Sequence, residues 1–356
     1  HPGAFLGWIL TDGIMMIAAI VLFFFGMSAI ALALCALSLI FAIVEFLLYK
    51  KLLDPFFPKK TSHNVVAVRK PKGEVKRRII FSGHADSANE WRFTYYGGSK
   101  LLVPIIGLSF VGILLGLVLG IWAVAAGHAF SAADSGALNV MRYVFLAWIP
   151  ILFTALFFEN KKRPVMGAND DLTGCFISMA VVKYMQQHDI RFENTEVWVV
   201  LTGSEEAGLR GSIAFTRMHK GEPILDNVWN INIDSVADKD YFEVVVKDDW
   251  QFCRFDKDLE TMFKDTFAEL GIESKTKGCI HNPVGGCDST PMTKAGAKSV
   301  TFAAQDPTLT YYYHTWRDMP ERFDVETVGN GFDVVLGVID KIDKFQQANG
   351  FTGPRR

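Results

Sequence analysis

Residues 196–208 read EVWVVLTGSEEAG, a short apolar run followed at once by a glycine and two adjacent glutamates. Runs of four to eight apolar residues, rich in β-branched side chains, are typical of strands that are buried on both faces. Two further stretches have the same form, RRIIFSGHAD at 77–86 and VWNINID at 228–234. We therefore expect three buried strands, each of which runs directly into ionisable side chains.

The other polar stretches alternate between short apolar runs and segments of helical length. The expected strands are 64–69, 77–83, 196–203, 228–234, 242–246 and 298–304, and the expected helices are 173–187, 207–219, 256–270 and 321–348. Strands that alternate with helices usually pair in parallel, and helices then cover both faces of the sheet. The sequence thus predicts an α/β domain with a mostly parallel, mixed central sheet and helices on both faces.

An apolar segment near the start does not fit this domain. Half of the 356 residues are hydrophobic and the mean hydropathy is +0.21, but the excess is local. Residues 14–49 contain one clearly charged side chain, Glu45. As a single helix this segment would be about 54 Å long, whereas the hydrocarbon core of a bilayer is about 30 Å thick. We therefore expect it to fold back near 26–28, giving helices 6–26 and 28–50.

A second apolar pair follows at 101–126 and 141–158. A secretory signal peptide has an apolar part of about 7–15 residues, so the first pair is too long to be one. We predict four transmembrane helices, with an N-terminal hairpin in residues 1–53. The second hairpin, at 101–158, is expected to be inserted into a polar domain at 60–356.

The charges of the connecting loops predict how these helices are oriented. Residues 50–100 contain twelve Lys and Arg, residues 161–163 contain three more, and the loop 127–140 contains none. By the positive-inside rule the polar domain faces the cytoplasm, where the five cysteines are expected to be free thiols. We expect a multi-pass membrane protein in contact with membrane lipid, located in the plasma membrane if the source is bacterial. The basic run KGEVKRR at 72–78 suggests nucleic-acid binding, but the net charge of −2 and the missing recognition motif argue against a nucleic-acid partner.

Ionisable side chains gather where the predicted strands end. The carboxyl ends of parallel strands share one edge of a sheet, and this is the edge at which open α/β folds bind ligands. The turn GANDDLTG at 167–174 can reach the same edge if the helix after it packs on the sheet. The edge is then expected to hold His84, Asp170, Glu205, Glu206 and Asp234.

Each of these residues also has a plainer interpretation. Asp170 or Asp171 fits a helix N-cap, and Glu205, three residues after Thr202, fits a capping box. His84 alone fits a structural histidine. When these residues lie at one edge, a different interpretation is favoured. Crowded carboxylates repel one another in a site of reduced dielectric, whereas a divalent cation between them attracts each of them. The sequence therefore predicts a metal site.

The types of side chain select the metal. Imidazole nitrogen combined with carboxylate oxygen, and no cysteine in the motifs, suits zinc in a catalytic rather than a structural site. Asp86 follows His84 by two residues and is placed to orient its imidazole from outside the metal site.

Five motifs in this order resemble one known family. They are GHADS (83–87), GANDDLTG (167–174), TGSEEAGLRGS (202–212), NIDS (232–235) and YHT (313–315). Together they resemble the clan MH zinc aminopeptidases, which include secreted bacterial leucyl aminopeptidases, glutamate carboxypeptidase II and the glutaminyl cyclases. The resemblance covers essentially all of residues 64–340 except the inserted hairpin.

The resemblance implies a cofactor of two Zn²⁺ ions, with roles that are carried over residue by residue. Asp170 would bridge the two ions. His84 and Asp234 would complete one site, and Glu206 and His314 would complete the other.

The resemblance also implies how the site works. Glu205 would be the general base, which takes a proton from a metal-bridging water and passes it to the leaving amine. In this family the peptide bond between the two adjacent aspartates is usually cis, and we expect the same of Asp170–Asp171.

The sequence departs from the family in two respects. About 80 residues, including the inserted hairpin, separate the first motif from the bridging aspartate, where soluble members have a short loop. Many members also carry a tyrosine before the last histidine, which holds the reaction intermediate, and residues 278–290 contain none. His281 and Tyr313 are our candidates for substrate binding in its place. Asp288 matches an aspartate of the family that we expect to be structural.

Several functions remain open at this point. The first is a membrane-anchored aminopeptidase acting on peptides, and the alternative is an amidase or deacylase of N-acyl amino acids or other amphipathic amides. A glutaminyl cyclase would keep one zinc, whereas this chain has all the ligands for two. A non-catalytic membrane scaffold, like the family's nicalin-like members, would have lost ligands. The sequence defines neither the substrate nor the oligomeric state.

Overall fold

The computed structural model describes residues 1–133, 135–282 and 285–349. Three parts of our expectations therefore lie outside the described residues: Asp134 in the loop 127–140, positions 283 and 284 in the stretch 278–290, and the C-terminal limit at 356. The chain forms two compact units. The helical unit comprises His1–Lys60, Asn89–Pro164 and Leu309–Thr315, and the α/β unit comprises Thr61–Ala88, Val165–Thr308 and Trp316–Arg356.

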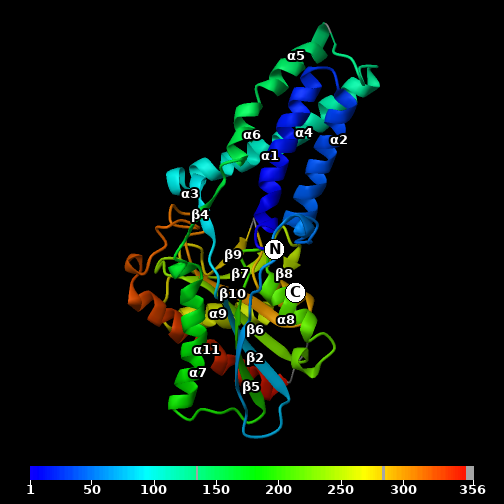
Figure 1. The fold of residues 1–356 in the computed structure, drawn as a ribbon. Coiled ribbons are helices and arrows are strands. Elements are labelled where there is room, and N and C mark those ends of the chain that lie inside the picture. The colour runs from blue at the N-terminus through cyan, green and yellow to red at the C-terminus, as the bar shows by residue number, and fades with distance from the viewer. Residues whose placement is uncertain (134, 283–284, 350–356) are drawn as a thin grey trace. The chain divides into compact units, whose positions relative to one another are not determined.

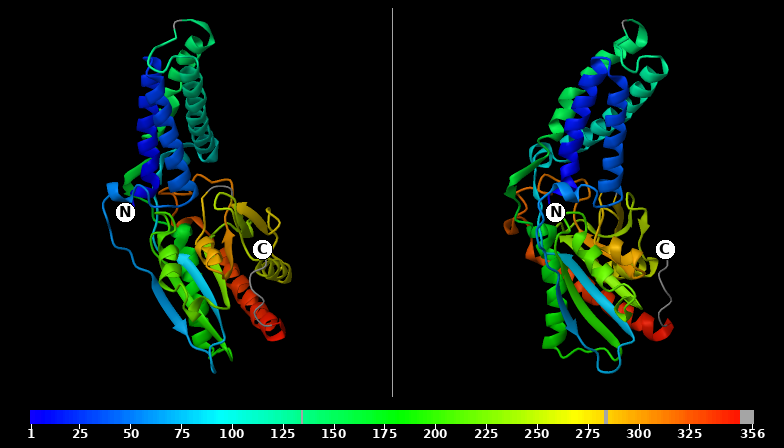
Figure 2. Two further views of the ribbon diagram at one scale, coloured as in Figure 1. Left: turned by 90° about the vertical axis from the view of Figure 1, so that its right-hand side faces the viewer. Right: turned by 45° about the vertical axis from the view of Figure 1, so that its right-hand side comes forward.

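The helical unit is a bundle of apolar helices that run side by side (Figures 1 and 2). Its helices are α1 (Ala4–Phe24), α2 (Ser28–Phe41), α4 (Ser99–Ala125), α5 (Gly136–Leu146) and α6 (Ile149–Ala155), and α2 continues as the π-helical turn η1 (Ala42–Leu47). The chain reverses between α1 and α2 at Gly26, whose φ of 81° favours glycine, as expected for the turn at 26–28. Four segments among the described residues are long and apolar enough to cross a membrane.

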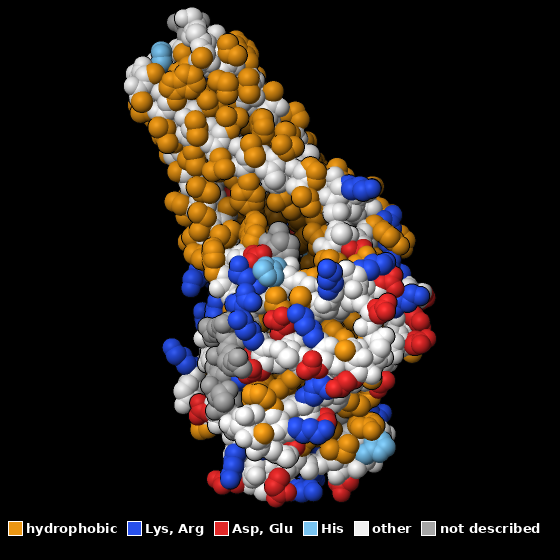
Figure 3. Space-filling view, turned by 180° about the vertical axis from the view of Figure 1, so that it is seen from behind, with side chains coloured by type: hydrophobic (Ala, Val, Ile, Leu, Met, Phe, Trp, Pro, Cys, Tyr) orange, Lys and Arg blue, Asp and Glu red, His pale blue; other side chains and the backbone are white. Residues whose placement is uncertain are grey.

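The surface of this bundle is apolar as well as its interior. Figure 3 shows hydrophobic side chains over nearly all of its visible face. Exposed examples on three different helices are Ile14, Val118 and Val140. An apolar exterior of this extent fits lipid better than water.

One expected helix differs from the structure. We expected a single helix at 141–158, but the segment starts at Gly136 and divides into α5 and α6 at Ala147–Trp148. Pro150 lies in the first turn of α6. Proline lacks the N–H that would continue the helix and its ring clashes with the carbonyl four residues earlier, which explains the break.

The base of the inserted hairpin contains a small sheet that the sequence did not reveal. Strands β3 (Asn89–Trp91) and β4 (Glu159–Pro164) pair antiparallel, with Trp91 opposite Glu159. The short helix α3 (Arg92–Gly97) leads from β3 toward α4, and the turn η2 (Asp54–Phe56) follows α2. The chain therefore enters and leaves the insertion on two paired strands.

The α/β unit is built on an eight-stranded sheet. Its strands are β1 (Val65–Arg69), β2 (Arg77–His84), β5 (Thr195–Thr202), β6 (Val228–Val236), β7 (Phe242–Asp248), β8 (Cys253–Arg254), β9 (Cys279–Asn282) and β10 (Lys298–Ala304). The order is β1-β5-β2-β6-β10-β7-β8, with β9 paired to β7. The central pairs β5/β2, β2/β6 and β6/β10 are parallel, whereas β1, β7 and β8 pair antiparallel. All six expected strands are present, and β8 and β9 are additional.

Helices cover both faces of this sheet, as expected. They are α7 (Gly174–Gln187), α8 (Arg210–Met218), α9 (Lys257–Glu269), α10 (Ser289–Lys294) and α11 (Val325–Asn349), with short turns η3 (Ala168–Thr173), η4 (Pro223–Leu225) and η5 (Pro320–Arg322). Alternate residues of β2 face opposite sides. Ile79 and Phe81 belong to the core under α7, α9 and α11, whereas Ile80 packs with Phe215 of α8 and Met292 of α10.

Candidate metal centre

Three adjacent strands end at the same edge of the sheet in the α/β unit. Parallel strands β5, β2 and β6 are neighbours in the sheet, and His84, the last residue of β2, lies opposite Thr202, the last residue of β5. Asp234 lies near the end of β6. Glu205 follows β5 by three residues. The strand order therefore explains why these side chains meet.

The two aspartates of GANDDLTG lie in η3, directly before α7. The Asp170–Asp171 peptide bond is cis, as the family resemblance implied. The Asp171 carboxylate accepts three backbone N–H groups: those of His84 at 2.9 Å, Gly174 at 3.0 Å and Ser235 at 3.1 Å. Asp171 thus ties the first residue of α7 to the ends of β2 and β6.

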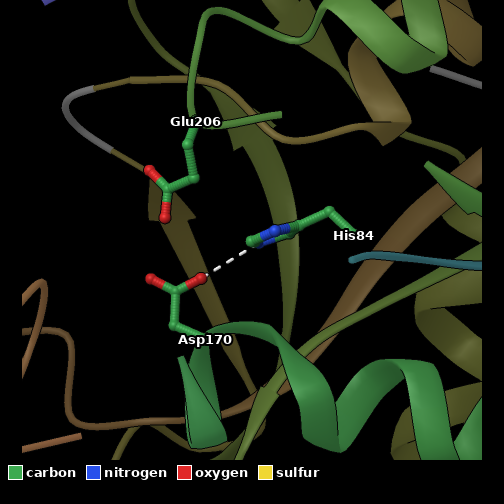
Figure 4. A group of neighbouring side chains, drawn as sticks. All are labelled: His84, Asp170 and Glu206. Carbon is green, nitrogen blue, oxygen red and sulfur yellow. Dashed lines mark ion pairs between the residues drawn. The ribbon is translucent and has the colours of Figure 1, made fainter. Parts of the chain in front are cut away.

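His84, Asp170 and Glu206 bring one ligand atom each to within 4.8 Å of one another. Figure 4 shows the three side chains pointing toward a common space. The His84 Nε2 atom lies 3.0 Å from Asp170 Oδ1. The other ring nitrogen, Nδ1, lies 3.0 Å from the backbone carbonyl oxygen of Asp86, so Nε2 is the nitrogen left to face the carboxylates.

A second group with the same spacing consists of His84, Asp171 and Asp234. Both oxygens of Asp171 already accept backbone N–H groups. Proximity alone would make Asp171 a ligand, but these hydrogen bonds favour Asp170 as the aspartate that is available to a metal. His84 and Asp234 remain as its partners in this second group.

The expected helix at 207–219 begins only at Arg210, so the capping-box interpretation of Glu205 is wrong. Glu205 and Glu206 lie in the turn before α8, where Leu209 has a φ of 55°. The Asp86 carboxylate accepts the backbone N–H of Glu205 at 2.9 Å and that of Glu206 at 3.3 Å. This turn is therefore fixed by Asp86 rather than by a helix.

The role expected of Asp86 needs a correction. Its carboxylate lies 3.9 Å from His84 Nδ1, beyond hydrogen-bonding distance, and it is the Asp86 backbone carbonyl that contacts the ring. The side chain instead holds the Glu205–Glu206 turn. Each of its two oxygens accepts one of these amides, Oδ1 that of Glu205 and Oδ2 that of Glu206.

The site is strongly acidic, and its side chains are buried or half-buried. Burial, helped by the charges of Asp170 and Asp288, raises the pKa of Asp234 to about 6. Burial and the charge of Glu206 also raise the pKa of Glu205 well above its usual range. Burial alone would lower the pKa of His84, but the hydrogen bond to Asp170 and the nearby carboxylates hold it well above 6.5. Neighbouring carboxylates contribute to all three shifts, so the site carries several negative charges close together.

The donor set fits zinc. One imidazole nitrogen and several carboxylate oxygens, all without cysteine, are the ligands of a catalytic zinc site. A bound cation would offset the negative charge of the carboxylates gathered here.

The fifth proposed ligand, His314, belongs to the helical unit. It is buried in a loop, with its ring stacked on Tyr313 at 4.0 Å between centroids and edge-on to Trp91 at 4.3 Å. Tyr313, our candidate for substrate binding, is therefore a direct neighbour of His314. The two metal-ligand groups found among the described residues of the α/β unit do not include His314.

The remaining candidates of the α/β unit have separate surroundings. His281 is exposed on β9, with its Nδ1 atom 3.5 Å from Asp249 Oδ1, and belongs to neither ligand group. Asp288 is buried and accepts hydrogen bonds from the hydroxyls of Thr202 and Ser212, which are contacts of the structural kind that we expected. The five cysteines are free, as predicted.

Sequence reasoning missed Asp318. Its carboxylate accepts the backbone N–H of Asn169 at 2.8 Å and that of Asp170 at 3.1 Å, and thereby fixes the backbone of the proposed bridging ligand. Asp318 lies in the segment WRDMP, far from any strand end. No signal in that segment distinguishes it from a surface aspartate.

Comparison with known proteins identifies the family. The family model of peptidase family M28 matches residues 153–339, more than half of the chain. The chain therefore belongs to peptidase family M28. No curated protein matched the chain.

Solved structures that resemble the chain include two aminopeptidases and a cyclase. An aminopeptidase from Aneurinibacillus sp. strain AM-1 has 16% identity and a TM-score of 0.47, covering 80% of this chain and 48% of that chain. The zinc aminopeptidase BSAP from Bacillus subtilis has 17% identity and a TM-score of 0.47, covering 78% and 49%. A glutaminyl cyclase from Bacteroides thetaiotaomicron, bound to N-acetylhistamine, has 16% identity and a TM-score of 0.47, covering 78% and 76%. The chain spans about half the length of the two aminopeptidases.

Proposed function

We propose that this protein is a membrane-anchored, zinc-dependent hydrolase of amide bonds that acts as an aminopeptidase. The observation that carries the proposal is the convergence of His84, Asp170 and Glu206, next to Glu205, in a chain of family M28. Four apolar helical segments support the membrane anchor.

The ligands of the proposed centre follow the family pattern. His84, Asp170 and Asp234 would hold one zinc ion, and Asp170, Glu206 and His314 would hold the other. When bound, zinc acts as a Lewis acid toward the amide carbonyl and lowers the pKa of water. Asp171 and Asp318 hold the backbone of this ligand set through the amides described above.

Glu205 is the proposed general base. Its turn is fixed by Asp86, and Glu205 is half-buried next to Glu206 without belonging to either ligand group. A carboxylate in this place takes a proton from the attacking water and returns it to the leaving amine. Asp86 thus supports catalysis as a positioning residue.

The test distinguishes the role of Glu205 as general base from that of Glu206 as zinc ligand. Glu205→Gln is expected to lower turnover by about 10²–10⁴-fold, the usual contribution of a general base, while zinc content stays unchanged. Glu206→Gln is expected to lower the zinc content itself. Glu193→Gln, at an exposed position of the same unit, is the matched control and keeps both activity and zinc. Activity is measured on aminoacyl amides, and zinc by elemental analysis of protein purified without chelator.

Two outcomes contradict this proposal. If Glu205→Gln keeps more than a few per cent of the wild-type rate, the proton is handled by another group. If active wild-type protein contains one metal ion or none, the two-zinc site is wrong. A parallel assay on N-acyl amino acids separates peptidase from amidase, the alternative that the apolar helices favour because an amphipathic substrate would partition into the surrounding lipid.

A further inference from the structure

His314 is held by the inserted segment of the chain. Its imidazole stacks on the Tyr313 ring, with an angle of 15° between the planes, and meets the Trp91 ring edge-on at 84°. Trp91 and Tyr313 in turn lie 5.8 Å apart at 89°. Two aromatic rings at nearly right angles restrict the imidazole on two sides, and such pairs prefer these geometries.

The backbone of Trp91 holds His314 as well. The Trp91 N–H donates to the His314 carbonyl oxygen at 2.8 Å. His314 has a φ of 51°, a left-handed conformation that is uncommon for a residue with a side chain and persists only where neighbours fix it. Further bonds close the loop around it: Tyr313 N–H donates to Thr310 O at 2.9 Å and Thr315 N–H to Tyr312 O at 2.9 Å.

Trp91 lies at the root of the inserted hairpin. It pairs with Glu159 across the β3–β4 sheet, and its ring packs on Phe158 at 4.9 Å. The next residue, Arg92, donates its backbone N–H to Phe158 O at 3.0 Å. Trp91 is therefore fixed by both chain passages, the one that enters the membrane helices and the one that leaves them.

We propose that Trp91 is a positioning residue for His314, so that the inserted membrane segment sets the fifth zinc ligand. This inference rests on the proposed function, in which His314 completes the zinc position shared with Glu206. The position served by His84 and Asp234 has no such dependence, because those residues are fixed by the α/β unit itself. One zinc position thus depends on the insertion and the other does not.

Asp318 follows His314 by four residues in the sequence but belongs to the α/β unit. Asp318 accepts the amides of Asn169 and Asp170, as described above. A change at the root of the insertion is expected to reach the zinc site through His314 rather than through Asp170, which Asp318 fixes independently.

The experiment measures zinc affinity rather than activity alone. Full-length protein in detergent is loaded with zinc, and the number of ions and their affinities are determined by elemental analysis and chelator competition. Wild type is expected to bind two ions, and His314→Ala one. Trp91→Ala is expected to lower the affinity for one zinc ion by about 10–100-fold, which is the usual effect of losing a group that supports a metal ligand. The affinity for the other ion is expected to stay unchanged.

Conservative and neighbouring variants separate positioning from general damage. Trp91→Phe keeps a ring edge and is expected to restore most of the affinity, whereas Trp91→Leu, which keeps apolar bulk, is expected to behave like Trp91→Ala. Tyr96→Ala, at an exposed position of the same insertion, is the matched control and keeps both ions. Trp91→Leu also replaces Trp91→Ala if the smaller residue prevents folding.

The outcomes distinguish this inference from the proposed function. If Trp91→Ala and Trp91→Leu bind both ions with wild-type affinity while His314→Ala loses one, the positioning role is wrong and the ligand set stands. If His314→Ala still binds two ions, the proposed ligand set is wrong. If folded Trp91→Leu loses both ions equally, the dependence is not specific to His314 and the inference is overturned.

Discussion

Asp171 explains why the chain places two carboxylates side by side. Its charge is balanced by three backbone N–H groups, which come from the end of β2, the end of β6 and the start of α7. A carboxylate that accepts several amides needs no cation of its own. In the proposed site the neighbouring Asp170 would bind the metal, so the pair would divide into one residue that fastens the elements together and one that binds the ligand.

A buried glutamate far along the sheet makes stability depend on pH. Glu243 on β7 is 1% exposed, and burial raises its pKa to about 8 from 4.5. Because the folded state holds this proton more tightly than the unfolded chain, the stabilisation is complete below about pH 4.5 and is lost as pH rises through about 8. The free energy of unfolding is expected to fall by about 1.4 kcal/mol per pH unit inside that window.

Glu243→Gln removes this titration and is the test. Thermal unfolding of wild type and variant in the same detergent is compared between pH 5.5 and pH 8.5. The melting temperature of the wild type is expected to fall relative to that of Glu243→Gln as pH rises. Parallel curves for the two proteins would show that Glu243 does not titrate in this range, because all other groups are common to both.

At the scale of elements, the sequence predicted the parts of the site that strand ends define. A buried strand that runs into an ionisable residue forms one continuous pattern in the sequence. For this reason β2, β5 and β6 and the ionisable residues at or near their ends could be predicted. Contacts between segments that are distant in the sequence could not be predicted. Neither Asp318, which binds the amides beside Asp170, nor the β3–β4 pair that supports Trp91 has a local pattern. The break at Ala147 was missed because hydropathy stays high across it, although Pro150 marks it.

Close packing between α7 and the sheet requires glycine at its first position. A Cβ atom at Gly174 would lie 2.1 Å from the carbonyl oxygen of Ile233 and 2.5 Å from Asp171 Oδ1. The backbone of β6 cannot yield without displacing Asp234. Gly174→Ala is therefore expected to destabilise the fold by about 1–3 kcal/mol and to weaken zinc binding, which melting temperature and zinc content will show.

Gly329 provides the matched control for this prediction. It lies inside α11, and a Cβ atom there meets nothing within 4 Å. Gly329→Ala is expected to raise stability by about 0.5–1 kcal/mol, the usual gain from alanine in a helix, and to leave zinc content unchanged. If both substitutions have the same effect, the close approach at Gly174 does not constrain the site.

At the scale of the whole molecule, the α/β unit tolerates a large insertion because the insertion begins and ends at neighbouring points. The Val165 N–H donates to Ala88 O at 3.0 Å, and Ser87 Oγ donates to Val165 O at 3.0 Å. Insertions are accepted where the two chain ends lie close together at the surface of a folded unit. The α/β unit therefore keeps its sheet order although residues 89–164 belong to the helical unit.

The distribution of Lys and Arg predicts that the α/β unit faces the cytoplasm, while the loop around Ser135 lies outside. The test places single reactive cysteines in a Cys279→Ser background, since the other four native cysteines are buried. Both positions are exposed. In intact cells, a membrane-impermeant maleimide is expected to label Ser135→Cys, and to label Glu193→Cys only after permeabilisation, because the charge distribution predicts that they face opposite sides of the membrane. The reverse pattern would invert the orientation, and labelling of both positions in intact cells would exclude a membrane-spanning arrangement.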